Sequence, residues 1–321
     1  MLRDRENIDI GLLDYSGAQK SALFGLIDFF ETATLLSDAV STRPLMPALI
    51  ELAGDPIAAL PEPGTLDVII CPPRLHKDAP SIMPFELEWL RAHHQTGCVM
   101  CSVCAGAFLL AKAALLDGRS ATTHWQLKDQ FQAQFPNVLL DTEKLIIDDG
   151  DVITAGGVMS WIDLALRIIE RFHSPSLMLN VARQFLVESG RREQRYYSSF
   201  APQLGHGNQA ILKVQHWLQK SYPEHQTING MAKIAGMSER TFLRRFQMSV
   251  GLTPISYLQA LRVEKARSLL ELSSDSFSQI AWQVGYQDPT SFQKIFLRTI
   301  GLSPKEYRRR FGISDLFKGK R

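Results

Sequence analysis

Cys104 is the residue of the N-terminal half whose neighbours could make it reactive. The run from Val99 to Ala113, VMCSVCAGAFLLAKA, is typical of an apolar strand, a sharp Cys-Ala-Gly turn and a helix. A cysteine on such a strand-to-helix elbow lies beside the free N–H groups of the helix start, which lower the pKa of a thiol. From the residues alone, three roles stay open for Cys104: lining of a ligand pocket, a catalytic nucleophile, and a redox or covalent sensor.

Cys98, Cys101 and Cys104 have the C-x-x-C-x-x-C spacing found at some iron–sulfur sites. They follow one apolar strand, however, and the alternation of a strand points Cys98 and Cys101 to opposite faces. We therefore expect no metal ion and no cofactor. The N-terminal stretch mixes acids with bases and lacks the apolar run of a signal peptide, so we expect a cytoplasmic protein without structural disulfides.

The C-terminal half contains an internal repeat. Residues 231–257 match residues 280–307 at eight positions, with an offset that grows from 49 to 50, so the second copy has one extra residue in its turn. A repeat of this kind indicates a duplicated unit, and the pattern within it is helix, short turn, helix. In the first copy, Gly236 is expected to end the first helix, Ser238 to cap the second and Pro254 to stop it.

The second helix of each copy is predicted to separate an apolar face from a DNA-facing one. At about 100° per residue, the phenylalanine pairs 242/246 and 292/296 each fall on one side. The DNA-facing side carries Arg240, Thr241, Leu243, Arg244 and Gln247 in the first copy, and Thr290, Gln293 and Lys294 in the second. Arginine can bind guanine, and glutamine adenine, by paired hydrogen bonds in the major groove. The alternative is that these side chains form a solvated helix surface.

The two copies differ in charge on this face. The first copy has two basic side chains there, Arg240 and Arg244, and the second has one, Lys294. We therefore expect the first copy to carry more of the base recognition.

The first 180 residues alternate strand-like and helix-like segments. Apolar or β-branched runs of strand length cover residues 8–13, 66–71, 98–103 and, with a break, 144–154. Helical patterns cover residues 23–37, 83–94, 105–116 and 161–172. This alternation predicts a doubly wound, flavodoxin-like α/β domain over residues 1–189. Residues 190–208 lack periodicity and are expected to be a linker to an all-α domain over residues 209–321.

The formal net charge of +2 on 321 residues hides an asymmetry between the halves. Residues 1–190 contain 14 Lys and Arg against 24 Asp and Glu, a net charge of −10. Residues 191–321 contain 21 against 9, a net charge of +12. This difference favours a polyanion as the partner of the basic half over chance clustering of surface bases. A composition that is 45% hydrophobic and 21% charged excludes a disordered chain and a small disulfide scaffold.

Residues 228–311 resemble the AraC/XylS-type DNA-binding domain, in which a long helix joins two helix-turn-helix units. The first unit matches in A-x-x-x-G-M-S-x-R-T-F-x-R-R-F and G-L-T-P-x-x-Y-L. The second matches in I-A-x-x-V-G-Y-x-D-P-T-S-F and F-x-R-x-x-G-L-S-P-K-E-Y-R. The resemblance implies that residues 262–271 lie on the joining helix. It also implies that both recognition helices can enter successive major grooves on one face of the DNA.

About 170 residues of the N-terminal half resemble the PfpI-type, class I glutamine-amidotransferase-like domain. Besides the elbow at Cys104, the matching segments are Y-S-G-A-Q at 15–19, A-T-T-H-W at 121–125 and V-I-T-A-G-G-V-M-S-W-I-D-L-A-L at 152–166. Such a domain followed by an AraC-type domain is similar to the GlxA-like transcriptional regulators, over nearly the whole chain.

This resemblance bears on whether the N-terminal domain is an enzyme. Related enzymes place a carboxylate where this chain has Ala22, and hydrating relatives have a hydroxyl residue where this chain has Ala105. His124 is either the base of the family pattern or a structural residue, and Asp28 is either a solvated acid or part of a pocket wall. We therefore expect no catalysis, and instead a pocket that Cys104, Ala105 and His124 line for a small-molecule effector.

Together these features predict a one-component transcription factor. The N-terminal domain would bind the effector and form a homodimer, and the C-terminal domain would bind double-stranded promoter DNA. The resemblance favours activation, with RNA polymerase as a further partner, and no membrane is involved. Two alternatives stay open: a cysteine-dependent hydrolase or hydratase with a DNA-binding tail, and a redox switch at Cys104.

Overall fold

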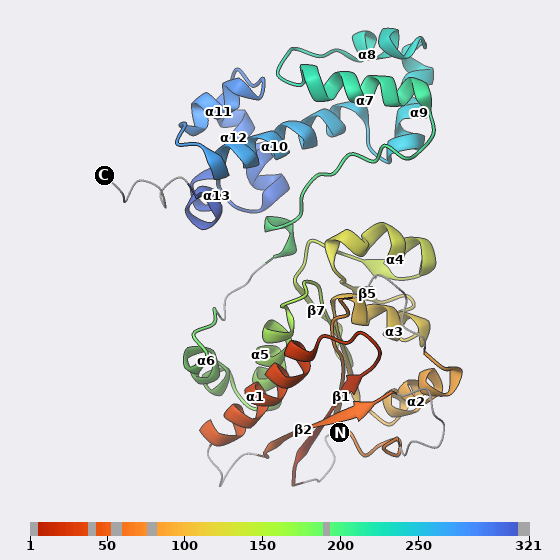
Figure 1. The fold of residues 1–321 in the computed structure, drawn as a ribbon, viewed down its shortest axis with the longest axis vertical. Helices are drawn as coiled ribbons and strands as arrows, with labels where there is room; N and C mark the ends of the chain where they lie inside the picture. Colours follow the sequence, from red (N-terminus) through yellow and green to blue (C-terminus); the bar gives the residue numbers. More distant parts are fainter. Residues whose placement is uncertain (1–5, 38–42, 53–59, 76–81, 189–192, 314–321) are drawn as a thin grey trace. The chain divides into compact units, whose positions relative to one another are not determined.

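The computed structural model describes residues 6–37, 43–52, 60–75, 82–188 and 193–313, which form two compact units. The first unit extends to Gln194 and the second begins at Arg195. Figure 1 shows a sheet flanked by helices in the first unit and helices alone in the second. In the described part of the chain, no helix is both long and apolar enough to cross a bilayer.

The first unit is built on a six-stranded sheet with the order β2-β1-β3-β4-β8-β7. Five strands are parallel, and only β7, at one edge, is antiparallel to its neighbour. The strands are β1 (Ile8–Asp14), β2 (Leu45–Glu51), β3 (Val68–Cys71), β4 (Val99–Val103), β7 (Ile146–Asp148) and β8 (Val152–Ala155). A separate pair joins β5 (Ser120–Ala121) to β6 (Leu139–Leu140).

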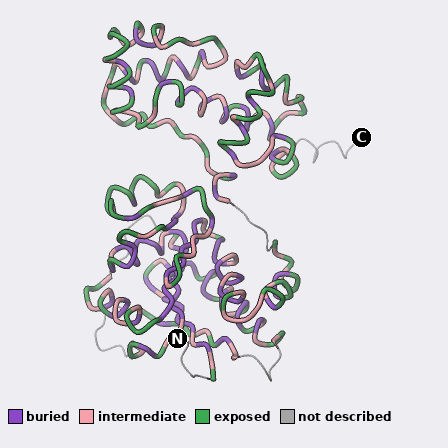
Figure 2. The backbone as a smooth tube through the Cα atoms, turned by 180° about the vertical axis from the view of Figure 1, so that it is seen from behind, coloured by how far each residue is buried: buried purple, intermediate pink, exposed green. Residues whose placement is uncertain are grey.

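Helices cover both faces of this sheet, which confirms the predicted doubly wound α/β fold. They are α1 (Lys20–Leu36), α2 (Pro84–Gln95), α3 (Ala107–Lys112), α4 (Lys128–Gln134), α5 (Trp161–Phe172) and α6 (Pro175–Gln184). Helices α1, α5 and α6 pack together on one face, and α2 packs against α3 on the other (Figure 1). β3, β4 and β8 are buried at every position, because helices lie above and below them. Figure 2 shows the buried residues gathered in the interior of the first unit.

Several elements of the first unit differ from the sequence prediction, which did not include α4, α6, β2, β5 and β6. Strand β2 was not predicted, because it contains Pro47 and alternates irregularly between buried and exposed residues. It lies at the edge of the sheet, where a proline without an N–H group is tolerated. The helix predicted over residues 105–116 ends at Lys112. There Ala114 takes a left-handed conformation, with φ of 58°, and the N–H of Leu115 bonds to the carbonyl of Leu110.

The second unit consists of helices, as predicted. They are α7 (Gln209–Ser221), α8 (Ile228–Ala235), α9 (Glu239–Val250), α10 (Pro254–Leu272), α11 (Phe277–Gln283), α12 (Pro289–Ile300) and α13 (Pro304–Phe311). They enclose two separate hydrophobic cores, one around α8 and α9 and one around α11 and α12. The long helix α10 joins them, because Leu258 and Leu261 belong to the first core while Ala266 and Leu270 belong to the second.

The turns of the two helix-turn-helix units confirm the predicted duplication and its extra residue. Helix α8 ends at Gly236, with φ of 65°, and Ser238 caps α9 by accepting a hydrogen bond from the N–H of Thr241. In the second helix-turn-helix unit, Gly285 takes the place of Gly236, with φ of 90°, and Asp288 caps α12. The cap residue comes two positions after the glycine in the first helix-turn-helix unit and three positions after it in the second. The extra residue of the second copy therefore lies in the turn, and the second helix of each copy starts at an equivalent place.

Candidate DNA interface and effector site

The apolar face of helix α9 is held in place by aromatic rings that pack edge to face. Phe242 and Phe246 are fully buried and pack edge to face, with ring centroids 5.5 Å apart. Phe246 packs in the same way on Tyr257 of α10, also at 5.5 Å. These contacts fix the rotation of α9 about its axis. As a result Arg240, Leu243, Arg244 and Gln247 are exposed on the other side.

Thr241 is the one predicted DNA residue of α9 that is only half-exposed. Its N–H donates to the Ser238 hydroxyl, and that hydroxyl in turn donates to Thr241 Oγ1 at 3.0 Å. Thr241 therefore belongs to the helix cap, and its hydroxyl keeps lone pairs and a hydrogen for a further partner.

Helix α12 repeats this arrangement. Phe292 and Phe296 are buried, and Phe296 packs on Tyr307 of α13 with ring centroids 5.6 Å apart. Thr290, Gln293 and Lys294 are exposed, as the sequence analysis predicted. Arg298 is also exposed, one helical turn beyond Lys294. Arg298 was not among the predicted contacts, although its spacing of four residues from Lys294 places it on the same side of the helix.

The two recognition faces therefore differ less in charge than the sequence suggested. Each second helix presents a pair of exposed basic side chains one turn apart, Arg240 and Arg244 on α9 and Lys294 and Arg298 on α12. Helix α9 also carries the exposed Arg245, which is rotated away from Arg240 and Arg244. The paired side chains lie on one face of a helix, so they can contact phosphates and base edges together. The net charge of +12 on residues 191–321 favours such contacts.

Cys104 lies on the predicted strand-to-helix elbow, directly after β4. Its backbone is left-handed, with φ of 54°, which is the strained geometry of such an elbow. The residue is only 3% exposed, and burial raises the pKa of its thiol to about 11. A thiol with that pKa is neutral at pH 7, so the elbow does not supply a thiolate nucleophile there.

His124 and Ala105, the residues expected to line a pocket together with Cys104, have different neighbours. His124 accepts a hydrogen bond at Nδ1 from the N–H of Gln126, and its ring stacks on Trp125 with centroids 5.6 Å apart. Burial lowers its pKa, so the imidazole is neutral near pH 7. Among the described residues no contact joins His124 to Cys104, and Ala105 is half-buried beside the core.

Two further positions were singled out for the acid that an enzyme would need. Ala22 is fully buried within α1, so it contributes only a methyl group there. Asp28 lies on the exposed face of α1 and is not part of the lining of the depression described next.

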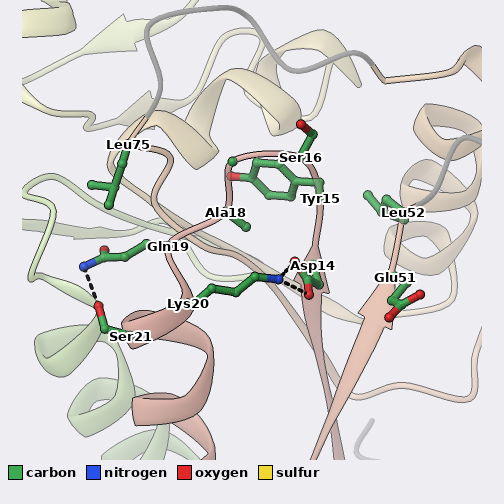
Figure 3. Close-up of a pocket in the computed structure, with 11 residues that line it drawn as sticks. Asp14, Tyr15, Ser16, Ala18, Gln19, Lys20, Ser21, Glu51, Leu52 and Leu75 are labelled. Atoms are coloured by element: carbon green, nitrogen blue, oxygen red, sulfur yellow. Dashed lines mark hydrogen bonds and ion pairs between the residues drawn. The ribbon is translucent and has the colours of Figure 1, made fainter.

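An open depression of about 670 Å³ lies at the carboxyl ends of β1 and β2, beside the start of α1 (Figure 3). Its polar lining includes Asp14, Gln19, Lys20 and Glu51. Lys20 Nζ forms an ion pair with the Asp14 carboxylate at 2.7 Å. The Gln19 side chain donates from Nε2 to Ser21 Oγ at 2.8 Å, while its buried Oε1 has no partner among the described residues.

Tyr15 lines this depression and also lies close to the elbow. Its hydroxyl donates to the carbonyl oxygen of Pro72. Burial raises its pKa, and charge on Cys71 or Cys104 would raise it further. Ligands of open α/β sheets bind at the carboxyl ends of the strands, and the depression and the elbow both lie there. This depression was not predicted from the sequence, although the Y-S-G-A-Q segment at residues 15–19, which carries the family resemblance, forms part of its lining.

Comparison with known proteins finds family matches in both units. Residues 63–171 match the DJ-1/PfpI family, and residues 231–310 match a helix-turn-helix domain family. The HTH-type transcriptional regulator CdhR of Pseudomonas aeruginosa is 30% identical over 229 residues, which are 71% of this chain and 68% of CdhR. The HTH-type transcriptional regulator GlxA of Rhizobium meliloti is 28% identical over 226 residues, 70% of this chain and 69% of GlxA.

A solved AraC family transcriptional regulator from Pseudomonas putida superposes with a TM-score of 0.47 at 16% identity, over 56% of this chain and 99% of that one. The duplicated helix-turn-helix unit and the sequence matches define a DNA-binding transcriptional regulator. The chain belongs to the family of HTH-type transcriptional regulators, and it joins a DJ-1/PfpI domain to an AraC-type helix-turn-helix domain.

Proposed function

We propose that this protein binds promoter DNA through α9 and α12 and activates transcription under the control of a small-molecule effector. The observation that carries the DNA-binding part is the matched pair of helices, each with two buried phenylalanines on one side and exposed basic and amide side chains on the other. The predicted contacts are those of Arg240, Thr241, Leu243, Arg244 and Gln247 on α9 and Thr290, Gln293 and Lys294 on α12. Arg298 is added to them.

The effector is proposed to bind at the carboxyl end of the sheet in the first unit. Its site would include the depression beside Asp14 and Lys20, and the elbow region with Cys104, Ala105 and His124. The open volume and the buried, unpartnered Oε1 of Gln19 support this location. The effector would act by favouring one of the arrangements open to the DNA-binding units.

We propose that the first unit has no catalytic activity of its own. The pKa of about 11 at Cys104 and the methyl group at Ala22 support this proposal. A homodimer formed through residues 1–189, with the linker over residues 190–208 and DNA-binding units over residues 209–321, would double the contacts to one DNA site. RNA polymerase would be the further partner of an activator.

The DNA-binding proposal is tested by selecting a site from random duplex DNA with the full chain and measuring three variants on it. We expect Arg244→Ala and Lys294→Ala to weaken binding to the selected site by roughly 10–100-fold. They should also reduce the ratio of the affinity for the selected site to the affinity for scrambled DNA. The control Lys213→Ala removes an exposed lysine from α7. Equal effects of all three variants would contradict the assignment of α9 and α12.

The same assay separates the two helices. Because α9 and α12 each present a pair of exposed basic side chains, the comparison of Arg244→Ala with Lys294→Ala decides whether the first helix-turn-helix unit carries more of the base recognition. A larger loss of selectivity for Arg244→Ala would support that prediction, and equal losses would refute it.

A further inference from the structure

The side chain of Gln194 fills a polar recess inside the first unit and is only 2% exposed. Its Nε2 donates to Thr122 Oγ1 at 3.1 Å, to the carbonyl of Thr123 at 2.9 Å and to the carbonyl of Lys144 at 3.0 Å. Its Oε1 accepts from the N–H of Trp125 at 3.3 Å. Both ends of the carboxamide therefore have partners, and all of these partners belong to the first unit.

The recess lies at the same end of the sheet as the elbow. Thr123 joins the two, because its hydroxyl donates to the carbonyl oxygen of Cys104 at 2.7 Å. Gly156, the residue after β8, forms the floor, and a Cβ atom at this position would overlap the Gln194 amide. The absence of a side chain at Gly156 is what leaves room for the carboxamide.

We propose that this recess is a binding subsite for a primary carboxamide and that Gln194 is its intramolecular occupant. Three oxygens face the amide nitrogen and one N–H faces the amide oxygen, which is the complement of a primary amide. An ammonium group would leave the N–H of Trp125 without an acceptor, and a carboxylate would place its charge against three oxygens. A small amide ligand would compete with Gln194 for the same contacts.

Displacement of Gln194 would change how the chain connects the two units. Gln194 is the last residue of the first unit. Within the second unit, the carbonyl of Ser198 accepts a hydrogen bond from Arg267, and the N–H of Phe200 donates to Glu264 at 3.0 Å. The chain between these anchors is short, because Arg310 of the second unit already lies over the rings of Tyr196 and Tyr197. Displacement of the Gln194 side chain would leave its N–H bond to the carbonyl of Glu143 as the remaining contact of this residue with the described part of the first unit, and the connection would loosen. This step rests on the proposed effector control, whereas the subsite itself does not.

Thermal unfolding of the full chain with acetamide as the probe tests the subsite. Gln194→Ala is expected to lower the Tm of the first unit by several degrees, because it removes a hydrogen-bond partner from each of four buried or half-buried polar groups of the recess. Acetamide can then enter the vacated recess and should raise the Tm of this variant, with a Kd in the millimolar range. It should raise the Tm of the wild type much less, because the tethered Gln194 competes at high effective concentration.

Two variants and a second probe serve as controls. Gly156→Ala places a methyl group in the recess, so it should lower the Tm as Gln194→Ala does but give no response to acetamide. Gln132→Ala, which removes an exposed glutamine from α4, should change neither value. Methylammonium chloride should not replace acetamide. Equal acetamide shifts in wild type and Gln194→Ala, or equal shifts with the two probes, would overturn the subsite.

Affinity for the DNA site selected by the wild type tests the coupling. Gln194→Ala and Gly156→Ala should both change this affinity at least threefold in the same direction. Acetamide should restore the Tm of Gln194→Ala without restoring its affinity, because a free amide refills the recess but does not reconnect the chain. Unchanged affinity in both variants would overturn the coupling. A chain that selects no DNA site would refute the proposed function and leave the acetamide result intact.

Discussion

The hydroxyl of Thr123 donates a 2.7 Å hydrogen bond to the carbonyl oxygen of Cys104. Thr123 lies in the segment that follows β5, and its bond holds Cys104, whose backbone is left-handed, at the elbow after β4. The elbow geometry is therefore maintained while burial keeps the thiol protonated. A scaffold of this kind can shape a binding site without supplying a nucleophile.

The first prediction concerns the reactivity of Cys104. With a pKa of about 11, about one thiol in 10⁴ is ionised at pH 7. Alkylation by iodoacetamide, followed by peptide mass spectrometry, should be slow at pH 7 and accelerate about tenfold per pH unit. The same peptide in denatured protein is the control. A rate at pH 7 equal to that of the denatured control would contradict the protonated thiol.

The second prediction concerns the aromatic core behind α9. Phe246 is fully buried and contacts the rings of both Phe242 and Tyr257. Phe246→Ala should reduce the free energy of unfolding of the DNA-binding unit by about 3–5 kcal/mol, through lost burial and the cavity left behind. Denaturant unfolding measures this change. Met248→Ala, at a side chain that is 80% exposed, should cost less than about 0.5 kcal/mol.

The third prediction concerns the buried Arg267. Its Nε donates to the hydroxyl of Tyr307 at 2.9 Å, and that hydroxyl donates to Glu271, so α10 and α13 are joined through polar groups. Tyr307→Phe leaves the Nε group without this acceptor and should cost about 1–3 kcal/mol in the free energy of unfolding. Tyr197→Phe removes a hydroxyl near the surface and is the control. Equal costs for the two variants would show that the buried network adds nothing.

The fourth prediction concerns pH and Asp151. Hydrogen bonds from Arg119, at 3.1 Å to Oδ2, and from His94, at 2.6 Å, hold the pKa of the Asp151 carboxyl below its ordinary value. A lowered pKa in the folded state stabilises the fold above the unfolded pKa of about 3.9, and this contribution is lost as the pH falls below it. Asp151→Asn should therefore cost up to about 1 kcal/mol at pH 7, because the side chain is half-exposed, and less near pH 3.

Denaturant unfolding at both pH values checks the prediction for Asp151. Asp28→Asn, at an exposed acid of α1, is the control and should show no such difference. A cost for Asp151→Asn that is the same at pH 7 and pH 3 would exclude the ionised carboxylate as its source.

The fifth prediction concerns the salt dependence of DNA binding. If the net +12 of residues 191–321 neutralises phosphates, the logarithm of the association constant should fall linearly with the logarithm of the salt concentration. Fluorescence anisotropy on the selected site, with the full chain, measures the slope. Lys294→Gln should reduce it by about 1 if this lysine contacts a phosphate. Binding that is insensitive to salt would separate the basic charge from DNA recognition.

Much of the fold follows from local patterns in the sequence. The buried strands β1, β3, β4 and β8 are apolar runs, because each is covered on both faces, and α5 agrees with its predicted bounds at both ends. The repeat predicted Phe242, Phe246, Phe292 and Phe296 as core, because a helix of 3.6 residues per turn places positions four apart on one side. Strand β2 was not predicted, because it lies at the edge of the sheet and its mixture of buried and exposed residues gives no continuous apolar run.

The sequence by itself therefore determined the class of protein: an α/β unit with an elbow cysteine, and two helix-turn-helix units with their exposed basic residues. Only the tertiary structure decided the chemistry of the elbow, because the pKa of Cys104 depends on burial by residues distant in the chain. It also placed Gln194 against Thr122, 72 positions earlier, and Asp14 beside Glu51 in one depression. Such contacts join residues that no periodicity relates, so they appear only when the chain is folded.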